Sequence, residues 1–238
     1  MGILSNIGSA LSSVGSAICS GISSACSAIG GALFSGASGI ASLATGIVSP
    51  LIGLGLPEIL IGIKVIGGII STIAEMLGLK DKEETPEELG MKAEEAERKP
   101  EQFESTEKYI EYLRNEVQID KEKLENLSDE DKVKYAAIGS SIYVKGMEEK
   151  YGMNMPADFW RTVADLKMDG QEVKAYIDNF KKHNITDMSD MTNYIKRDLD
   201  DGKDRGAISD AMIDSLKELN PDATREELYE KLISLNDE

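Results

Sequence analysis

The 238-residue sequence contains a single histidine, His183, and two cysteines, Cys19 and Cys26. One histidine excludes metal sites built from several histidines, and a Ser-His-Asp or Cys-His catalytic site would have to use it. The cysteines are seven positions apart, so on one helix their Cα atoms are about 10.5 Å apart along the axis. That separation is too large for a disulfide within the helix. We interpret both cysteines as small apolar helix residues.

Charged side chains are nearly absent from the first third of the chain. Residues 1–79 contain Glu58, Lys64 and Glu75, whereas all but two of the 43 acidic and all but one of the 26 basic side chains follow. The net charge of −17 argues against binding to nucleic acid, because the phosphates would repel the chain. The start also lacks the Lys or Arg that opens a cleavable secretion signal, so we expect no signal peptide.

An eleven-residue repeat runs through this charge-free start. Eleven residues make three helical turns at about 3.67 residues per turn, so residues eleven apart lie on nearly one face of a helix. Large apolar residues recur at fixed positions of the repeat, and Gly, Ser and Ala fill the other faces. The repeat predicts a membrane or assembly contact formed by Ile7, Ile18, Ile29, Ile40, Leu11, Ile22 and Leu33.

The same segment is too rich in glycine to be helical alone in water. Residues 2–46 contain nine glycines, and each costs about 1 kcal/mol relative to alanine in an exposed helix. A flexible Gly/Ser linker would have no reason to keep large apolar residues in register. We therefore expect a helix that is ordered by a covering partner, which is either lipid or protein.

Residues 59–79 form an apolar segment of membrane-spanning length. As a helix they would rise about 32 Å, which matches a hydrocarbon core of about 30 Å. Residues 39–56 are apolar and long enough to return, and Pro57 and Glu58 between the two segments predict a turn. The pattern favours a two-helix membrane hairpin over the alternative, a buried amphipathic helix in the core of an oligomer.

Lys64 and Glu75 are the candidate charges within the membrane. A charge at the bilayer centre costs roughly 2.5–3.5 kcal/mol, which snorkelling toward the helix ends would reduce. The two residues are eleven apart on one helical face, with about 16.5 Å of rise between them, so they cannot pair within the helix. An antiparallel neighbour would pair Lys64 with Glu75 across an interface, or both would line a wet cavity.

The acidic part is predicted to consist of helices separated by turns. Thr85, Pro86 and Glu88 form a helix start, and this helix, with little apolar face, is expected to be a solvated connector that ends at Pro100. Gly139 lies in the middle of a later helix and allows a close helix contact. Helices are expected at roughly 106–126, 128–151, 156–168, 171–182, 189–200, 207–219 and 225–235, with almost no sheet.

These patterns predict a mainly α fold, in which long Gly/Ala/Ser-rich hydrophobic N-terminal helices precede a soluble acidic multi-helix domain. Residues 1–79 would be the membrane- or assembly-inserting segment, residues 80–103 a charged connector and residues 104–238 an acidic helical domain. No motif in the sequence indicates catalysis, a metal or a cofactor, so we expect a protein that is not an enzyme.

The layout is similar in kind to pore-forming toxins and to phage or injection-system proteins that are delivered into a cell envelope. We therefore expect a membrane-active homo-oligomer whose apolar part inserts into or crosses a lipid bilayer, with the acidic part as a soluble shield or docking module. The alternative is a structural component of a particle, such as a virion or tail protein, whose N-terminal helix packs against other protein subunits.

Overall fold

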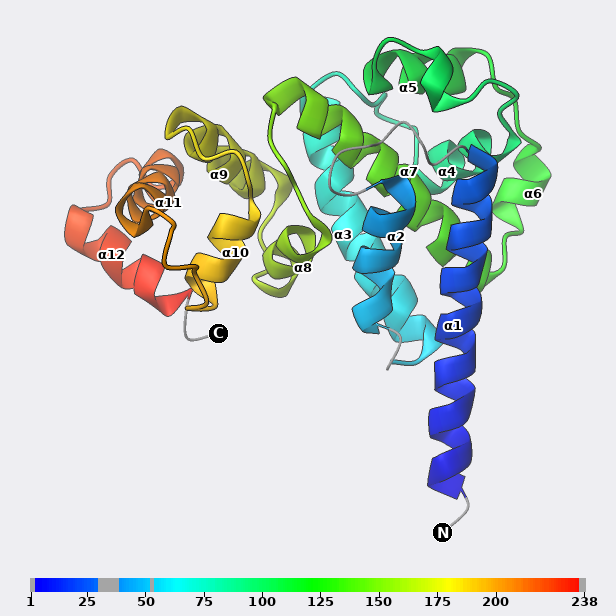
Figure 1. The fold of residues 1–238 in the computed structure, drawn as a ribbon, viewed down its shortest axis with the longest axis horizontal. Coiled ribbons are helices and arrows are strands. Elements are labelled where there is room, and N and C mark those ends of the chain that lie inside the picture. The colour runs from blue at the N-terminus through cyan, green and yellow to red at the C-terminus, as the bar shows by residue number, and fades with distance from the viewer. Residues whose placement is uncertain (1–2, 30–38, 52–53, 236–238) are drawn as a thin grey trace. The chain divides into compact units, whose positions relative to one another are not determined.

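The computed structural model describes residues 3–29, 39–51 and 54–235, and for residues 3–15 it describes the backbone alone. Helices make up 73% of the structure and the described residues contain no strand, which confirms the mainly α fold. The chain forms two compact units, Met1–Glu149 and Lys150–Glu238 (Figure 1). The boundaries expected from the change in charge, at residues 79 and 103, both lie inside the first unit.

The first unit places three apolar helices beside the first helices of the acidic part. In chain order its described helices are α1 (Ile3–Ile29), α2 (Ile40–Val48), the short 3-10 helix η1 (Ser49–Leu51), α3 (Leu56–Met76), α4 (Pro86–Glu95), the 3-10 helix η2 (Pro100–Gln102), α5 (Thr106–Asn115), α6 (Lys121–Glu125) and α7 (Asp129–Tyr151). α1 packs against α2, α3 and α4. Apolar and acidic segments therefore share one core.

α4 is buried, and the expectation of a solvated connector is wrong. Leu89, Met91 and Ala93 are buried, although the sequence shows no apolar stripe. The reason is a close backbone crossing between α4 and α7. A Cβ atom added to Gly90 would lie 2.2 Å from the Tyr135 carbonyl oxygen, and one added to Gly139 would lie 1.9 Å from the Pro86 carbonyl oxygen.

This crossing explains why α4 needs few large apolar side chains. Two glycines that face each other's helices let the backbones approach closely, so contact is made without bulky residues. The start of α4 is as predicted, since the Thr85 hydroxyl accepts a hydrogen bond from the Glu88 N–H at 3.1 Å. The helix ends at Glu95, before the position expected from Pro100.

The second unit is a cluster of short amphipathic helices. They are α8 (Ala157–Asp165), α9 (Gly170–Lys182), α10 (Ser189–Ile195), α11 (Arg205–Leu219) and α12 (Arg225–Ser234). α11 packs against α9, α10 and α12, and α10 also packs against α8. The fully buried Trp160 donates its indole N–H to the Met155 carbonyl at 3.0 Å.

Candidate functional site

α3 has one buried face and one exposed face. Its buried side chains include Ile59, Ile63 and Ile70, which belong to the core of the first unit. Among the described residues, α3 is the one helix that is long and apolar enough to cross a membrane, and 44% of its most apolar window is buried within the chain. About half of the helix surface is therefore available to something outside the chain's own core.

The exposed face of α3 carries most of the exposed large apolar side chains among the described residues. Ile61, Val65 and Met76 are 63%, 46% and 41% exposed, and Leu54 just before the helix is 45% exposed. Of the large apolar side chains exposed in the described part of the chain, Ile233 alone lies elsewhere. Clustered exposed apolar side chains mark interaction surfaces, whereas isolated ones need no explanation.

The three charges of the apolar part lie on this same face, because Glu58, Lys64 and Glu75 are all exposed. The eleven-residue spacing of Lys64 and Glu75 accordingly places both on the outward side of α3. Among the residues that the structure describes, neither has an ion-pair partner. The outward face of α3 is thus a mixed surface of apolar side chains and unpaired charges.

Pro57 and Glu58, which were predicted to form a turn, lie within the helix α3. Gly55 caps α3, and Pro57 and Glu58 occupy the first turn of the helix. Proline suits this position because its missing N–H has no partner there anyway, and a carboxylate is favourable at a helix N-terminus. α2 contains nine residues and would rise about 13.5 Å, so it is too short to be the second arm of a membrane hairpin.

The described part of the repeat stripe is covered by the chain itself. Ile18, Ile22 and Ile29 on α1 and Ile40 on α2 are all buried, because α1 packs against α2, α3 and α4. The Lys99 ammonium donates a hydrogen bond to the Ala28 carbonyl near the end of α1. A protein surface therefore covers the C-terminal half of α1.

The structure does not describe the side chains of the other predicted stripe residues. The side chains of Ile7 and Leu11 belong to the part of α1 whose backbone alone is described, and Leu33 lies outside the described residues. The first half of the α1 backbone extends beyond α2 and α4 in the first unit (Figure 1).

A buried ionic cluster ties the end of α3 to the acidic helices. The Glu84 carboxylate, whose side chain is 5% exposed, accepts a hydrogen bond from the Tyr143 hydroxyl at 2.7 Å and pairs with the Arg114 guanidinium at 3.3 Å. Arg114 also donates to the Leu79 carbonyl at 2.5 Å. Burial and the neighbouring Glu84 carboxylate raise the pKa of Tyr143 above its ordinary value. The cluster holds the segment after α3 against α5 and α7.

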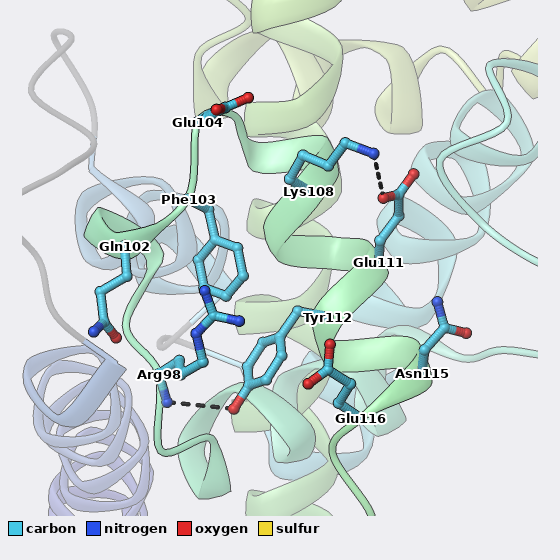
Figure 2. A pocket seen from close by; sticks show the side chains of 9 residues that line it. All are labelled: Arg98, Gln102, Phe103, Glu104, Lys108, Glu111, Tyr112, Asn115 and Glu116. Atoms are coloured by element: carbon cyan, nitrogen blue, oxygen red, sulfur yellow. Dashed lines mark hydrogen bonds and ion pairs between the residues drawn. The ribbon is translucent and has the colours of Figure 1, made fainter.

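A surface hollow of about 390 Å³ lies beside α5 (Figure 2). The Arg98 guanidinium stacks over the Phe103 ring, 4.3 Å from its centroid, and the Arg98 backbone N–H donates to the Tyr112 hydroxyl at 3.3 Å. At the rim, Lys108 pairs with Glu111 at 2.7 Å. Arg98, Phe103 and Tyr112 therefore contact one another, and Lys108 and Glu111 form an ion pair.

Two further observations concern the residues that could support catalysis or bind a metal. His183 directly follows the last residue of α9, and its Nε2 atom lies 2.8 Å from an Asp214 carboxylate oxygen. In the described residues, no three His, Cys, Asp or Glu side chains are grouped so that they could hold a metal ion. The mixed outward face of α3 therefore remains the main candidate site.

A scan against protein-family models, a search of curated proteins and a search of solved structures each found no match to this chain. The interpretation of the site therefore depends on its own residues. Sequence reasoning identified Lys64 and Glu75 but missed Ile61, Val65 and Met76. The helical period contains the missing signal, because Ile61 lies three residues before Lys64, and the positions 61, 65, 68, 72 and 76 follow one another at spacings of three or four residues.

Proposed function

We propose that the chain is a non-enzymatic membrane-inserting protein, which carries its apolar helices in a shielded form and inserts them into a bilayer as an oligomer. The observation that carries this proposal is α3, which combines membrane-spanning length with an outward face rich in apolar side chains. The 57 residues before Glu58 contain no charged side chain. A segment of this length without charge is typical of protein that enters lipid.

The packing of the first unit supports a shielded form. The inward isoleucines of α3 and the buried stripe of α1 lie in one core with α4 and α7, whose other residues include many acids. These acidic residues favour solubility, because net charge keeps molecules apart in water. On insertion the isoleucines would exchange one apolar environment for another, so the exchange itself has a small free-energy cost.

The three charges of α3 set limits on this insertion. Glu58 and Glu75 lie in the first and last turns of the helix, where side chains reach the polar interface. Lys64 lies eight residues after Leu56, or about 12 Å along the helix. Its long side chain reduces the cost by snorkelling toward the nearer interface.

The test uses the full chain and neutral phosphatidylcholine vesicles, because an acidic chain is repelled by anionic lipid. We expect the protein to sediment with the vesicles and to release a trapped dye. The variant Ile61→Asp/Val65→Asp should lose both activities, since each carboxylate costs roughly 2.5–3.5 kcal/mol near the bilayer centre. Its fold should persist, because both side chains are exposed.

A matched control distinguishes α3 from general surface effects. Ile233→Asp places one carboxylate at a position that is 57% exposed on α12, and it should leave vesicle binding unchanged. If the unaltered chain neither binds vesicles nor releases dye, the proposal fails. Equal loss in the α3 and α12 variants would also contradict it, because the effect would then be one of charge alone.

The second candidate function is a structural component of a large assembly. The observation that favours it is the mixture of unpaired charges and apolar side chains on α3, which is typical of protein interfaces. Partitioning in a detergent that separates into two phases distinguishes the candidates. A membrane-inserting chain enters the detergent phase, and an assembly component stays in the aqueous phase or with its particle.

A further inference from the structure

The outward face of α3 is nearly symmetric about its middle. Ile61 lies seven residues before Gly68 and Met76 eight residues after it, while Val65 and Thr72 lie three residues before and four after. Ile61, Val65, Gly68, Thr72 and Met76 are all exposed. If a second α3 lies antiparallel across this face near Gly68, each apolar residue meets its counterpart from the other end.

The charges of the same face have matching symmetry. In this antiparallel arrangement Lys64 lies opposite Glu75 of the partner subunit, and the two-fold axis repeats the pair. The midpoint between Lys64 and Glu75 lies one residue after the midpoint of the pairs Ile61–Met76 and Val65–Thr72. This offset is about 1.5 Å along the helix, and the long side chains of Lys64 and Glu75 can span it. A parallel arrangement would instead place like charges together, so the charge pattern selects the antiparallel one.

We propose that the outward face of α3 binds the same face of a second copy of this chain, with the two helices antiparallel and crossing at Gly68. This inference goes beyond the proposed function, because the dimer forms in water and requires no lipid. The dimer covers Ile61 and Val65 and neutralises Lys64 and Glu75, which have no ion-pair partner among the described residues of one chain.

Gly68 supplies an independent reason for a close neighbour. Glycine in the interior of a helix is unfavourable relative to alanine, yet a Cβ atom at Gly68 would meet nothing within 4 Å. Packing within the chain therefore does not require glycine at this position. A second helix backbone that approaches closely does require it, as at small-residue helix crossings.

Thr72 fits the same interface. Its hydroxyl donates to the Gly68 carbonyl at 2.9 Å, so the hydroxyl already has a partner and brings no unsatisfied donor into a dry contact. Lipid would cover the apolar side chains of this face but would leave Lys64 and Glu75 unpaired. A second copy satisfies both classes of side chain, and for this reason we favour it as the occupant in water.

Charge reversal tests the pairing directly. Sedimentation equilibrium of the full chain over a concentration series should show a monomer–dimer equilibrium. Lys64→Glu or Glu75→Lys alone should raise the dissociation constant about tenfold, because each change places like charges together twice in one dimer. The double variant Lys64→Glu/Glu75→Lys should restore the original value to within about threefold. Both residues are exposed, so circular dichroism should show an unchanged helix content.

Cross-linking tests the orientation. In a background with Cys19→Ala and Cys26→Ala, we expect Val65→Cys and Thr72→Cys to form a disulfide-linked dimer on oxidation when the two proteins are mixed. Ile61→Cys should not link to itself but should link to Met76→Cys when the two proteins are mixed. Ile233→Cys on α12, which is also exposed, controls for random collisions.

The inference is overturned by a monomer at every concentration, by a dimer whose affinity does not change on charge reversal, or by efficient self-linking at Ile61→Cys. Association that appears only with phosphatidylcholine vesicles also overturns it, because lipid would then be the occupant of the face. The vesicle assay tests the proposed function and the sedimentation assay tests the dimer, so either can be contradicted without the other. A chain that releases dye but remains a monomer keeps the proposed function and loses this dimer.

Discussion

The apolar helices of the first unit and the longer helices of the second unit begin in different ways. In the second unit, side chains cap the starts of α9, α11 and α12, and Asp169 at α9 and Thr224 at α12 form reciprocal capping boxes. In the first unit, α2 and α3 follow glycines that form no side-chain cap hydrogen bond. The second unit thus contains local signals for its helices, whereas the apolar helices of the first depend on tertiary contact.

The sources of that contact are distant in sequence. The buried stripe of α1 is covered partly by α4, and α4 in turn crosses α7 at Gly90 and Gly139. The apolar helices are therefore ordered only when the first helices of the acidic part are in place. This difference implies that damage to the α4–α7 crossing should unfold the first unit while the second unit stays folded.

The largest expected effect comes from Gly139→Ala. The new Cβ atom would collide with the Pro86 carbonyl oxygen, 1.9 Å away, and a backbone atom yields less easily than a side chain. We expect the first unit to lose about 3 kcal/mol or more of stability. Urea unfolding followed by circular dichroism reports the whole chain, and fluorescence of the single Trp160 reports the second unit.

The expected result is a first transition at lower urea and an unchanged Trp160 transition. Gly202→Ala is the matched control, because a Cβ atom there meets nothing within 4 Å, and it should leave both transitions in place. If Gly139→Ala shifts the Trp160 transition by the same amount, the two units unfold together and the contrast between them is wrong.

This contrast also explains what the sequence could predict. Helix starts follow from residues close in sequence, so Thr85 was identified correctly as a cap. The placement of α4 depends on Gly90 meeting the backbone of α7. The sequence around a glycine does not indicate which backbone packs against it. The prediction relied on apolar residues at helical spacing, and α4 has no such pattern.

The candidate site was predictable in part for the same reason. The eleven-residue spacing placed Lys64 and Glu75 on one face, and the structure exposes both. The cover of the α1 stripe was only partly predictable, because it includes α4, which begins 57 residues after the end of α1. The turn before α3 was misplaced because Pro57 suits both a turn and the first turn of a helix.

A second, intermediate effect is expected at the buried ionic cluster of the first unit. Glu84→Ala removes the acceptor of the Tyr143 hydroxyl and the ion pair of Arg114. We expect a loss of about 2–3 kcal/mol, since buried polar groups lose their partners. Far-UV circular dichroism in urea should show this loss in the first transition alone.

Glu95→Ala is the matched control for the buried pair. Glu95 pairs with Lys123 at 2.9 Å, but both side chains are exposed, so its removal should change stability by about 0.5 kcal/mol or less. Equal losses for Glu84→Ala and Glu95→Ala would show that burial does not distinguish the two pairs. The role of the cluster in holding the segment after α3 would then be wrong.

The smallest effect sharpens the description of the second unit. Asp187 is half-buried, and although burial opposes its charge, hydrogen bonds from Ser189 and from the Asn154 amide lower its pKa below the ordinary value of 3.8. Because the folded pKa is the lower one, the carboxylate stabilises the unit above pH 4, and this contribution is lost as the pH falls through the folded pKa.

The urea midpoint of Trp160 fluorescence should therefore fall on acidification, and Asp187→Asn should weaken that dependence. Asp201→Asn on an exposed turn should follow the unaltered chain, and an equal change in both variants would assign the pH dependence to net charge instead of the Asp187 hydrogen bonds.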